Sequence, residues 1–200
     1  METLDWLRQL PKPGPVWEVS GGPIDECITR PLWDEGYECV VVEPNPEHYV
    51  DYANATLDRE NVAFFPVAVA LEPCIVRLAR SKSGAAYVAG VNAPEVQKRG
   101  HPQWPDRTRR VPALPFDALD PGNIAGMILD VEGCEWWVLQ RLVSEPLLLI
   151  VELSHGSYCH PDEEAILAWM ASNDYQTGEV RDNGAQTVFV KKEKWDATRL

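Results

Sequence analysis

Residues 16–43 read VWEVSGGPIDECITRPLWDEGYECVVVE, and this stretch decides the fold. It begins with a short apolar run, Val16–Val19, which a turn of serine, glycine and proline follows at once. Residues 25–35 then read as a helix that ends at Gly36, and Cys39–Val42 form a compact β-branched run. A strand, a helix and a second strand within about 30 residues predict one βαβ unit.

The same alternation continues along the rest of the chain. We predict helices at 47–57, 134–143 and 162–172, and strands at 62–71 with a kink at Pro66, 74–79, 124–131 and 147–153. Two final runs, 175–180 and 186–190, flank a turn that contains Asn183-Gly184 and predict an antiparallel hairpin. Because strands alternate with helices, the pairing should be mostly parallel. The sequence therefore predicts an α/β fold, a doubly wound Rossmann-like sheet that ends in an antiparallel hairpin.

The length of the chain suits one domain. Two hundred residues can bury a large core, so we expect residues 1–200 to form a single domain. Residues 1–15 are expected to be an N-terminal extension, because the segment 10–15 is too rich in proline for regular structure. Residues 80–110 lose all periodicity, and a stretch of that length predicts a lid or substrate loop.

The charge of the chain narrows the classes of partner. Eighteen basic and 31 acidic side chains leave a formal net charge of -13. Such a protein repels phosphate backbones and anionic membranes, so we expect a small-molecule partner, with no nucleic acid and no membrane. The one short basic cluster holds Arg107, Arg109 and Arg110, of which Arg107 and Arg109 are candidates to recognise an anionic group of the substrate. A homo-oligomer is compatible with this composition.

The cysteines and the N-terminus indicate a compartment. Five scattered cysteines without a CxxC pair do not form a disulfide framework, so we expect reduced thiols in a cytoplasmic protein. The first residues carry charges where a signal peptide needs an apolar core. No apolar run approaches the roughly 20 residues that cross a bilayer.

Two features at the ends of the first two strands favour an adenosyl ligand. In open α/β sheets, ligands bind beyond the carboxyl ends of the strands. Gly21 and Gly22 follow the first strand and allow a close approach of the backbone to a ligand. Glu43 ends the second strand, 21 positions after Gly22, and a carboxylate there can accept both hydroxyl hydrogens of a ribose.

Acidic residues also follow the fourth long apolar run, in the sequence ILDVEGCE at positions 128–135. Asp130 is expected at a strand end that faces the ligand crevice, whereas Glu135 has the alternative role of a first-turn helix acid. His155 follows the next strand and could form a general-base site with Asp130. A structural histidine bonded to a loop carbonyl is an equal alternative. A metal held by Asp130, Glu152 and His155 is a weaker one, and we expect no metal.

These residues resemble the FkbM family of S-adenosylmethionine-dependent methyltransferases. The segment ILDVEGCE is similar to the Asp-x-Glu-Gly-x-Glu signature of that family, and VEPNP at 42–46 is similar to its ribose-binding strand end. The resemblance implies a class I methyltransferase fold, S-adenosylmethionine as cofactor, and methyl transfer to a hydroxyl of a sugar or secondary metabolite. It places the following residues beside the cofactor: Glu18, Gly21 and Gly22 on the methionine side, with Glu43, Pro44 and Asn45 at the ribose. It also places Asp130 near the transferred methyl group and Glu132 at the acceptor.

The glycine turn departs from the pattern of the family. Ser20 and Ile24 stand where that pattern has glycine, and Pro23 lacks a backbone donor. The sequence therefore predicts an O-methyltransferase with, as the alternative, a catalytically inactive methyltransferase-like binding or assembly subunit. Trp104 and Trp195 are candidate contact residues for that alternative. A dehydrogenase is a weaker interpretation because GxGxxG is absent.

Overall fold

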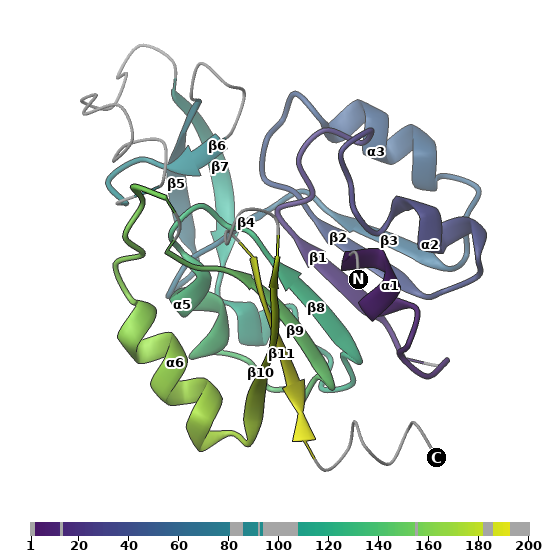
Figure 1. Cartoon of the computed structure of the whole chain (residues 1–200). Helices are drawn as coiled ribbons and strands as arrows, with labels where there is room; N and C mark the ends of the chain where they lie inside the picture. Colours follow the sequence, from purple (N-terminus) through teal and green to yellow (C-terminus); the bar gives the residue numbers. More distant parts are fainter. Residues whose placement is uncertain are drawn as a thin grey trace.

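The computed structural model of the chain describes residues 3–12, 14–80, 86–91, 93, 108–154, 156–181 and 186–192. Its main sheet has seven strands in the order β10-β11-β9-β8-β1-β2-β3 (Figure 1). Their bounds are β1 Val16–Val19, β2 Cys39–Val42, β3 Val62–Phe65, β8 Gly126–Leu129, β9 Leu148–Glu152, β10 Tyr175–Arg181 and β11 Gln186–Lys191. The five strands β9, β8, β1, β2 and β3 are parallel to one another, and β11 is antiparallel to both β9 and β10. The predicted doubly wound sheet with its C-terminal hairpin is confirmed.

Helices cover both faces of this sheet (Figure 1). Their bounds are α1 Thr3–Leu7, α2 Arg30–Asp34 and α3 Tyr49–Thr56 on one face, and α5 Glu135–Leu139 and α6 Glu163–Ser172 on the other. Successive strand residues point to opposite faces of the sheet. Val16 therefore packs in the core under α1, α2 and α3, and Trp17 packs in the core under α5 and α6. Because both faces are buried, the parallel strands are mostly apolar, as in LLIVE of β9, whose one acid is its last residue.

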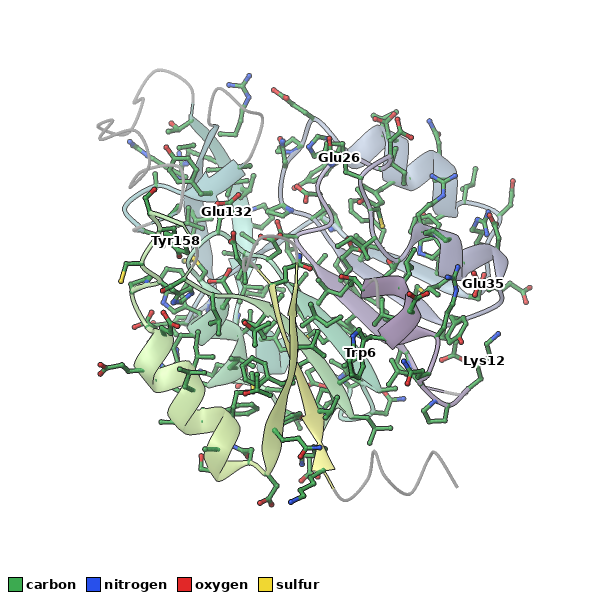
Figure 2. The ribbon with its side chains drawn as sticks, in the orientation of Figure 1. Trp6, Lys12, Glu26, Glu35, Glu132 and Tyr158 are labelled. Carbon is green, nitrogen blue, oxygen red and sulfur yellow. The ribbon has the colours of Figure 1, made fainter. Side chains whose placement is uncertain are left out.

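The segment at the N-terminus is more ordered than predicted. Helix α1 lies within the expected extension 1–15, and Trp6, Leu7 and Leu10 are buried in the core beneath the sheet. Their spacing gives one apolar helical face, which the prolines that follow mask in the sequence. Lys12 then donates a hydrogen bond to the carbonyl oxygen of Glu35 at 2.7 Å, which fastens this segment to the end of α2 (Figure 2).

A second, smaller sheet replaces part of the predicted loop at 80–110. It contains β4 Ala68–Val69, β5 Cys74–Arg80, β6 Ala86–Val88 and β7 Thr108–Leu114 in the order β4-β7-β5-β6. The prediction of a loop throughout was therefore wrong for β6 and for the start of β7, whereas residues 81–85, 92 and 94–107 lie outside the described residues. Strand β7 buries Val111 and Ala113 and exposes Arg109, Arg110 and Pro112, so its arginines and proline conceal a half-buried strand.

The register of the central strands sets the position of the site. Val19 at the end of β1 pairs with Val42 of β2 on one side and with Leu129 of β8 on the other. The residues that follow, Ser20, Glu43 and Asp130, therefore meet at one edge of the sheet. The strand order reverses between β1 and β8, which makes this edge the switch point where ligands bind in such folds. Among the described helices, none is long and apolar enough to cross a bilayer.

Candidate active site

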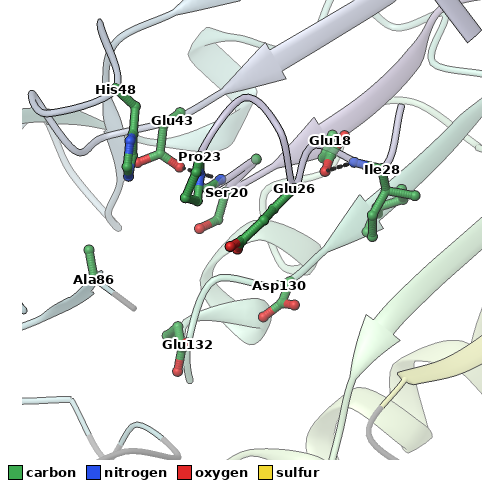
Figure 3. Close-up of a pocket in the computed structure, with 13 residues that line it drawn as sticks. Glu18, Ser20, Pro23, Glu26, Ile28, Glu43, His48, Ala86, Asp130 and Glu132 are labelled. Carbon is green, nitrogen blue, oxygen red and sulfur yellow. Dashed lines mark hydrogen bonds between the residues drawn. The ribbon is translucent and has the colours of Figure 1, made fainter. Parts of the chain in front are cut away.

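A cavity of about 490 Å³ lies at this edge of the sheet (Figure 3). Its walls come from the connection between β1 and α2, from the residues after β2 and β8, and from β6. Acidic side chains dominate the lining: Glu18, Glu26, Glu43, Asp130 and Glu132. Cavities that hold small ligands measure about 300–1,000 Å³. The cavity is thus large enough for a small molecule, and its acidic walls favour one with positive charge.

Glu43 is fixed on the cavity wall after β2. Its side chain is 2% exposed. One carboxylate oxygen accepts the backbone N–H of Gly22 at 2.8 Å, and the other accepts that of Asn45 at 2.7 Å. Burial raises the pKa of Glu43 to about 7, although both backbone bonds oppose the rise. Each oxygen keeps a second acceptor position, so the carboxylate can still accept donors from a ligand.

The turn after β1 combines a packing constraint with an open side. A Cβ atom on Gly21 would lie 2.6 Å from the hydroxyl oxygen of Tyr52, which donates to the Gly21 carbonyl at 3.1 Å. Gly22 has a φ of +61°, yet a Cβ there would meet nothing within 4 Å. Ser20 adopts a φ of +77°, a conformation that favours glycine. Gly21 is therefore required by the packing of α3, and Gly22 borders open space.

Glu18 makes its hydrogen bonds to its own chain. It is buried and accepts the backbone N–H groups of Ile28 and Thr29, both at 2.8 Å, and the Thr29 hydroxyl at 2.7 Å. The thiol of Cys27 donates to it as well, at 3.2 Å. Burial raises the pKa of Glu18 against these bonds. Glu18 thus shapes the cavity wall by holding residues 27–29, and the cofactor contact expected of it stays a prediction.

Glu135 forms a buried pair with His160. Nε2 of His160 lies 2.6 Å from one Glu135 oxygen, and both side chains are fully buried. Nδ1 of His160 accepts the backbone N–H of Asp162 at 3.0 Å, so the ring proton sits on Nε2 and is donated to Glu135. The other Glu135 oxygen accepts the N–H groups of Val131 and Gly133. Glu135 therefore fixes the loop between β8 and α5, beyond the helix-dipole role considered for it.

Asp130, Glu135 and Glu152 bring a ligand atom each within 4.8 Å of one another. A cluster of that size could hold a metal ion, but the described donors already occupy both oxygens of Glu135. Burial first, and then the charge of Glu135, raises the pKa of Asp130. Burial and the charge of Asp130 also raise the pKa of Glu152. Two buried carboxyl groups this close oppose each other's ionisation, and Asp130 is the one that lines the cavity.

Glu132, His48 and Glu26 also line the cavity. Glu132, predicted at the acceptor, does line it, and its φ of +55° is rare for a residue with a side chain. His48 and Glu26 also line it, and neither was predicted (Figure 3). His48 lies 3.1 Å from the amide nitrogen of Asn45, so Asn45 supports the wall while His48 faces the cavity. The place of His48 five positions after a strand-terminal acid was a usable signal.

Some predicted residues do not come to this cavity. Pro44 lines a smaller neighbouring cavity that shares Ser20 and Ala86 with the main one. Arg109 is exposed on β7 and is not among the described residues that line the cavity. The remaining predictions, for His155, Arg107, Trp104 and Trp195, lie outside the described residues.

The sequence of the site matches a known family. The description of that family is Methyltransferase FkbM domain, and the match covers residues 20–177. The chain belongs to the FkbM methyltransferase family. The matched range includes Glu43, Asp130 and Glu132, so the described cavity lining of this FkbM methyltransferase domain lies inside that range except for Glu18.

Several solved structures resemble the chain at low sequence identity. The methyltransferase domain of the bacterial CtHen1-CN has a TM-score of 0.49 at 10% identity, covering 94% of this chain and 93% of that one. The N-methyltransferase NodS from Bradyrhizobium japonicum has a TM-score of 0.46 at 9% identity, covering 95% and 94%. Fibrillarin from Aeropyrum pernix, solved with natively bound S-adenosyl-L-methionine, has a TM-score of 0.45 at 10% identity, covering 88% and 66%. No curated protein matches the chain by sequence.

Proposed function

We propose that this FkbM domain is an S-adenosylmethionine-dependent O-methyltransferase acting on a hydroxyl of a small polar molecule, such as a sugar or secondary metabolite. The observation that carries the proposal is the arrangement of two acids across one cavity. Glu43 lies on the β2 side and Asp130 on the β8 side, with the glycine turn between them (Figure 3). This arrangement suits a cofactor whose ribose is held by Glu43 and whose reactive methyl group lies near Asp130.

The residues at the cavity fit the cofactor. The carboxylate of Glu43, fixed by Gly22 and Asn45, retains acceptor positions for the two hydroxyl groups of a ribose. Gly22 leaves open space where a side chain would stand. The acidic walls complement the positive charge of a sulfonium and of an α-amino group. A volume of about 490 Å³ has room for the cofactor and a small acceptor.

The chain's own residues position the acceptor and remove its proton. When bound, S-adenosylmethionine supplies a methyl group that is electrophilic because it is attached to a positively charged sulfur. Asp130 would accept the proton of the acceptor hydroxyl while the hydroxyl oxygen bonds to the methyl carbon; the carbon–sulfur bond would break and S-adenosylhomocysteine would leave with the electron pair on its sulfur. Its raised pKa makes it a stronger base than an exposed aspartate, while it remains ionised near neutral pH. Much of the remaining rate enhancement comes from holding the two reactants in line.

Calorimetry tests the cofactor half of the proposal. We expect heat on titration of S-adenosylmethionine and S-adenosylhomocysteine into the wild-type chain. Glu43→Ala should weaken both by roughly tenfold or more, because it removes charged acceptors for two hydroxyl groups. The matched control is Glu47→Ala, an exposed acid on the same segment. No heat at millimolar ligand would contradict the proposal.

Methyl transfer tests the acceptor half. Tritiated S-adenosylmethionine is incubated with a panel of neutral sugars and hydroxylated natural products, and label in the acceptor is counted. Transfer should require the ionised form of Asp130, so Asp130→Asn should bind cofactor without transferring the methyl group. Label on nitrogen or carbon rather than oxygen would show that the chain is a methyltransferase but would contradict the proposal that it methylates a hydroxyl group.

One observation favours an inactive binding subunit as a second candidate. The N–H of Gly22 donates to Glu43, and Pro23 has no N–H, so two backbone positions of the turn offer no donor to a ligand. The calorimetric titration separates the candidates, because an inactive subunit that has lost its cofactor gives no heat while its melting temperature stays normal.

A further inference from the structure

Three polar side chains lie in a row on neighbouring strand ends behind the cavity. Leu129 at the end of β8 pairs with Val151 of β9, so Asp130 and Glu152 are the next residues along each strand. Glu152 pairs with Gln186 of β11 on its other side. The row therefore crosses from the parallel part of the sheet into the hairpin, and only its first member lines the cavity.

The side chains of this row meet at Asp130. An oxygen of Asp130 lies within 4.8 Å of one of Glu152, and the side chains of Glu152 and Gln186 can each donate a hydrogen bond to the Asp130 carboxylate. The carbonyl oxygen of the Gln186 amide accepts the Thr3 hydroxyl at 3.5 Å, which leaves its NH₂ group as the donor to Asp130. Between two carboxyl groups a hydrogen bond needs a proton, and Glu152 is the member whose surroundings favour keeping it.

The electrostatic surroundings explain why Glu152 keeps the proton. Glu152 is 9% exposed and faces the carboxyl groups of Asp130, Glu132 and Glu135. Burial and these three acids all oppose a negative charge on Glu152. Asp130 faces Glu135 and Glu18 as well, but the donor groups of Glu152 and Gln186 beside it favour its charged form. The proton therefore stays on Glu152 while Asp130 ionises.

We propose that Glu152, in its protonated form, and Gln186 are positioning residues that hold Asp130 ionised and oriented toward the cavity. The role of Asp130 as the base rests on the proposed function. Its contacts with Glu152 and Gln186 are independent of that function. Two donors on one carboxylate leave few orientations, so the free lone pairs face the acceptor. The hairpin strand β11 thereby takes part in the site, although it contributes no residue to the described cavity lining.

Carbon-13 NMR of the side-chain carboxyl groups, in the cofactor-free protein, tests this directly. In the wild type, Asp130 should titrate below Glu152. Glu152→Leu removes the donor without opening a space, and should raise the Asp130 pKa by about one to two pH units. Glu152→Gln keeps an N–H donor and should leave the Asp130 pKa within about half a unit of the wild type. An unchanged Asp130 titration in Glu152→Leu, or ionisation of Glu152 first, would overturn the proposal.

Further measurements separate the possible failures. Gln186→Leu, at a partly exposed strand position, should also raise the Asp130 pKa, and it serves if Glu152→Leu does not fold. Melting temperatures check the fold of each variant. In the transfer assay, Glu152→Leu should lower kcat more than it changes KM and move the acidic limb of the pH profile upward, with Glu152→Gln restoring both. If the NMR shifts occur but no methyl group is transferred, the proposed function fails and this inference stands.

Discussion

Replacing Glu43 by glutamine separates the cost of a buried charge from the rest of the stability of the protein. The pKa of Glu43 rises from 4.5 to about 7 because of burial. An acid whose pKa is raised in the folded state binds its proton more tightly there than in the unfolded chain. Its contribution to stability is therefore complete below about pH 4.5 and is lost as the pH rises through 7. We expect the cofactor-free wild type to be more stable at pH 5 than at pH 8.

The size of the effect follows from the pKa. At about 1.4 kcal/mol per pKa unit, Glu43 accounts for roughly 2–3 kcal/mol of stability lost between pH 5 and pH 8. Glu43→Gln cannot ionise, so the difference between the two pH values should shrink by that amount. The variant should also be less stable at pH 5, since its amide NH₂ group faces the N–H of Gly22 or Asn45.

Urea unfolding followed by circular dichroism, at both pH values, measures this difference. Asp130 and Glu152 act in the same direction, so the comparison is between variant and wild type rather than with a flat profile. Glu72→Gln removes an acid at an exposed position and should leave the difference unchanged. Equal pH dependence in Glu43→Gln and wild type would refute the reasoning.

Other substitutions test separate parts of the site. Asp130→Asn should reduce methyl transfer by roughly 10²–10⁴-fold with cofactor affinity within a few-fold, measured by labelled transfer and calorimetry. His160→Leu removes the donor to one buried oxygen of Glu135 and should cost about 1–3 kcal/mol in urea unfolding, unlike an exposed substitution. Gly21→Ala forces a Cβ to 2.6 Å from the Tyr52 hydroxyl oxygen and should cost about 1–3 kcal/mol, and a thermal melt equal to wild type would disprove that contact.

The main sheet was predictable because its strands are short apolar runs that end at turn residues or acids. Val16–Val19 and Cys39–Val42 begin and end as predicted, since glycine or an acid follows each run. Strand β7 was missed because only alternate residues are buried and arginines occupy the exposed positions. Helix α1 was missed because it is short and a proline-rich segment begins four residues after its end. Local pattern thus identified elements buried on two faces better than elements buried on one.

The site was predictable where a residue directly follows a parallel strand. Glu43 and Asp130 meet because β2 and β8 lie on either side of β1 and these parallel strands end together. Glu135 begins α5, and its partner His160 lies 25 positions later in the loop after β9. No local sequence pattern predicts this contact. Gln186 reaches Asp130 only through the antiparallel register of β11. Contacts that depend on long loops or on hairpin register therefore needed the structure.

A crystal structure of the chain with S-adenosylhomocysteine tests the central claim most directly. We expect ligand density along the cavity, with the ribose hydroxyl groups hydrogen-bonded to the Glu43 carboxylate and the sulfur directed toward Asp130. Crystals soaked at millimolar ligand with an empty cavity, or with the ligand bound elsewhere, would contradict it.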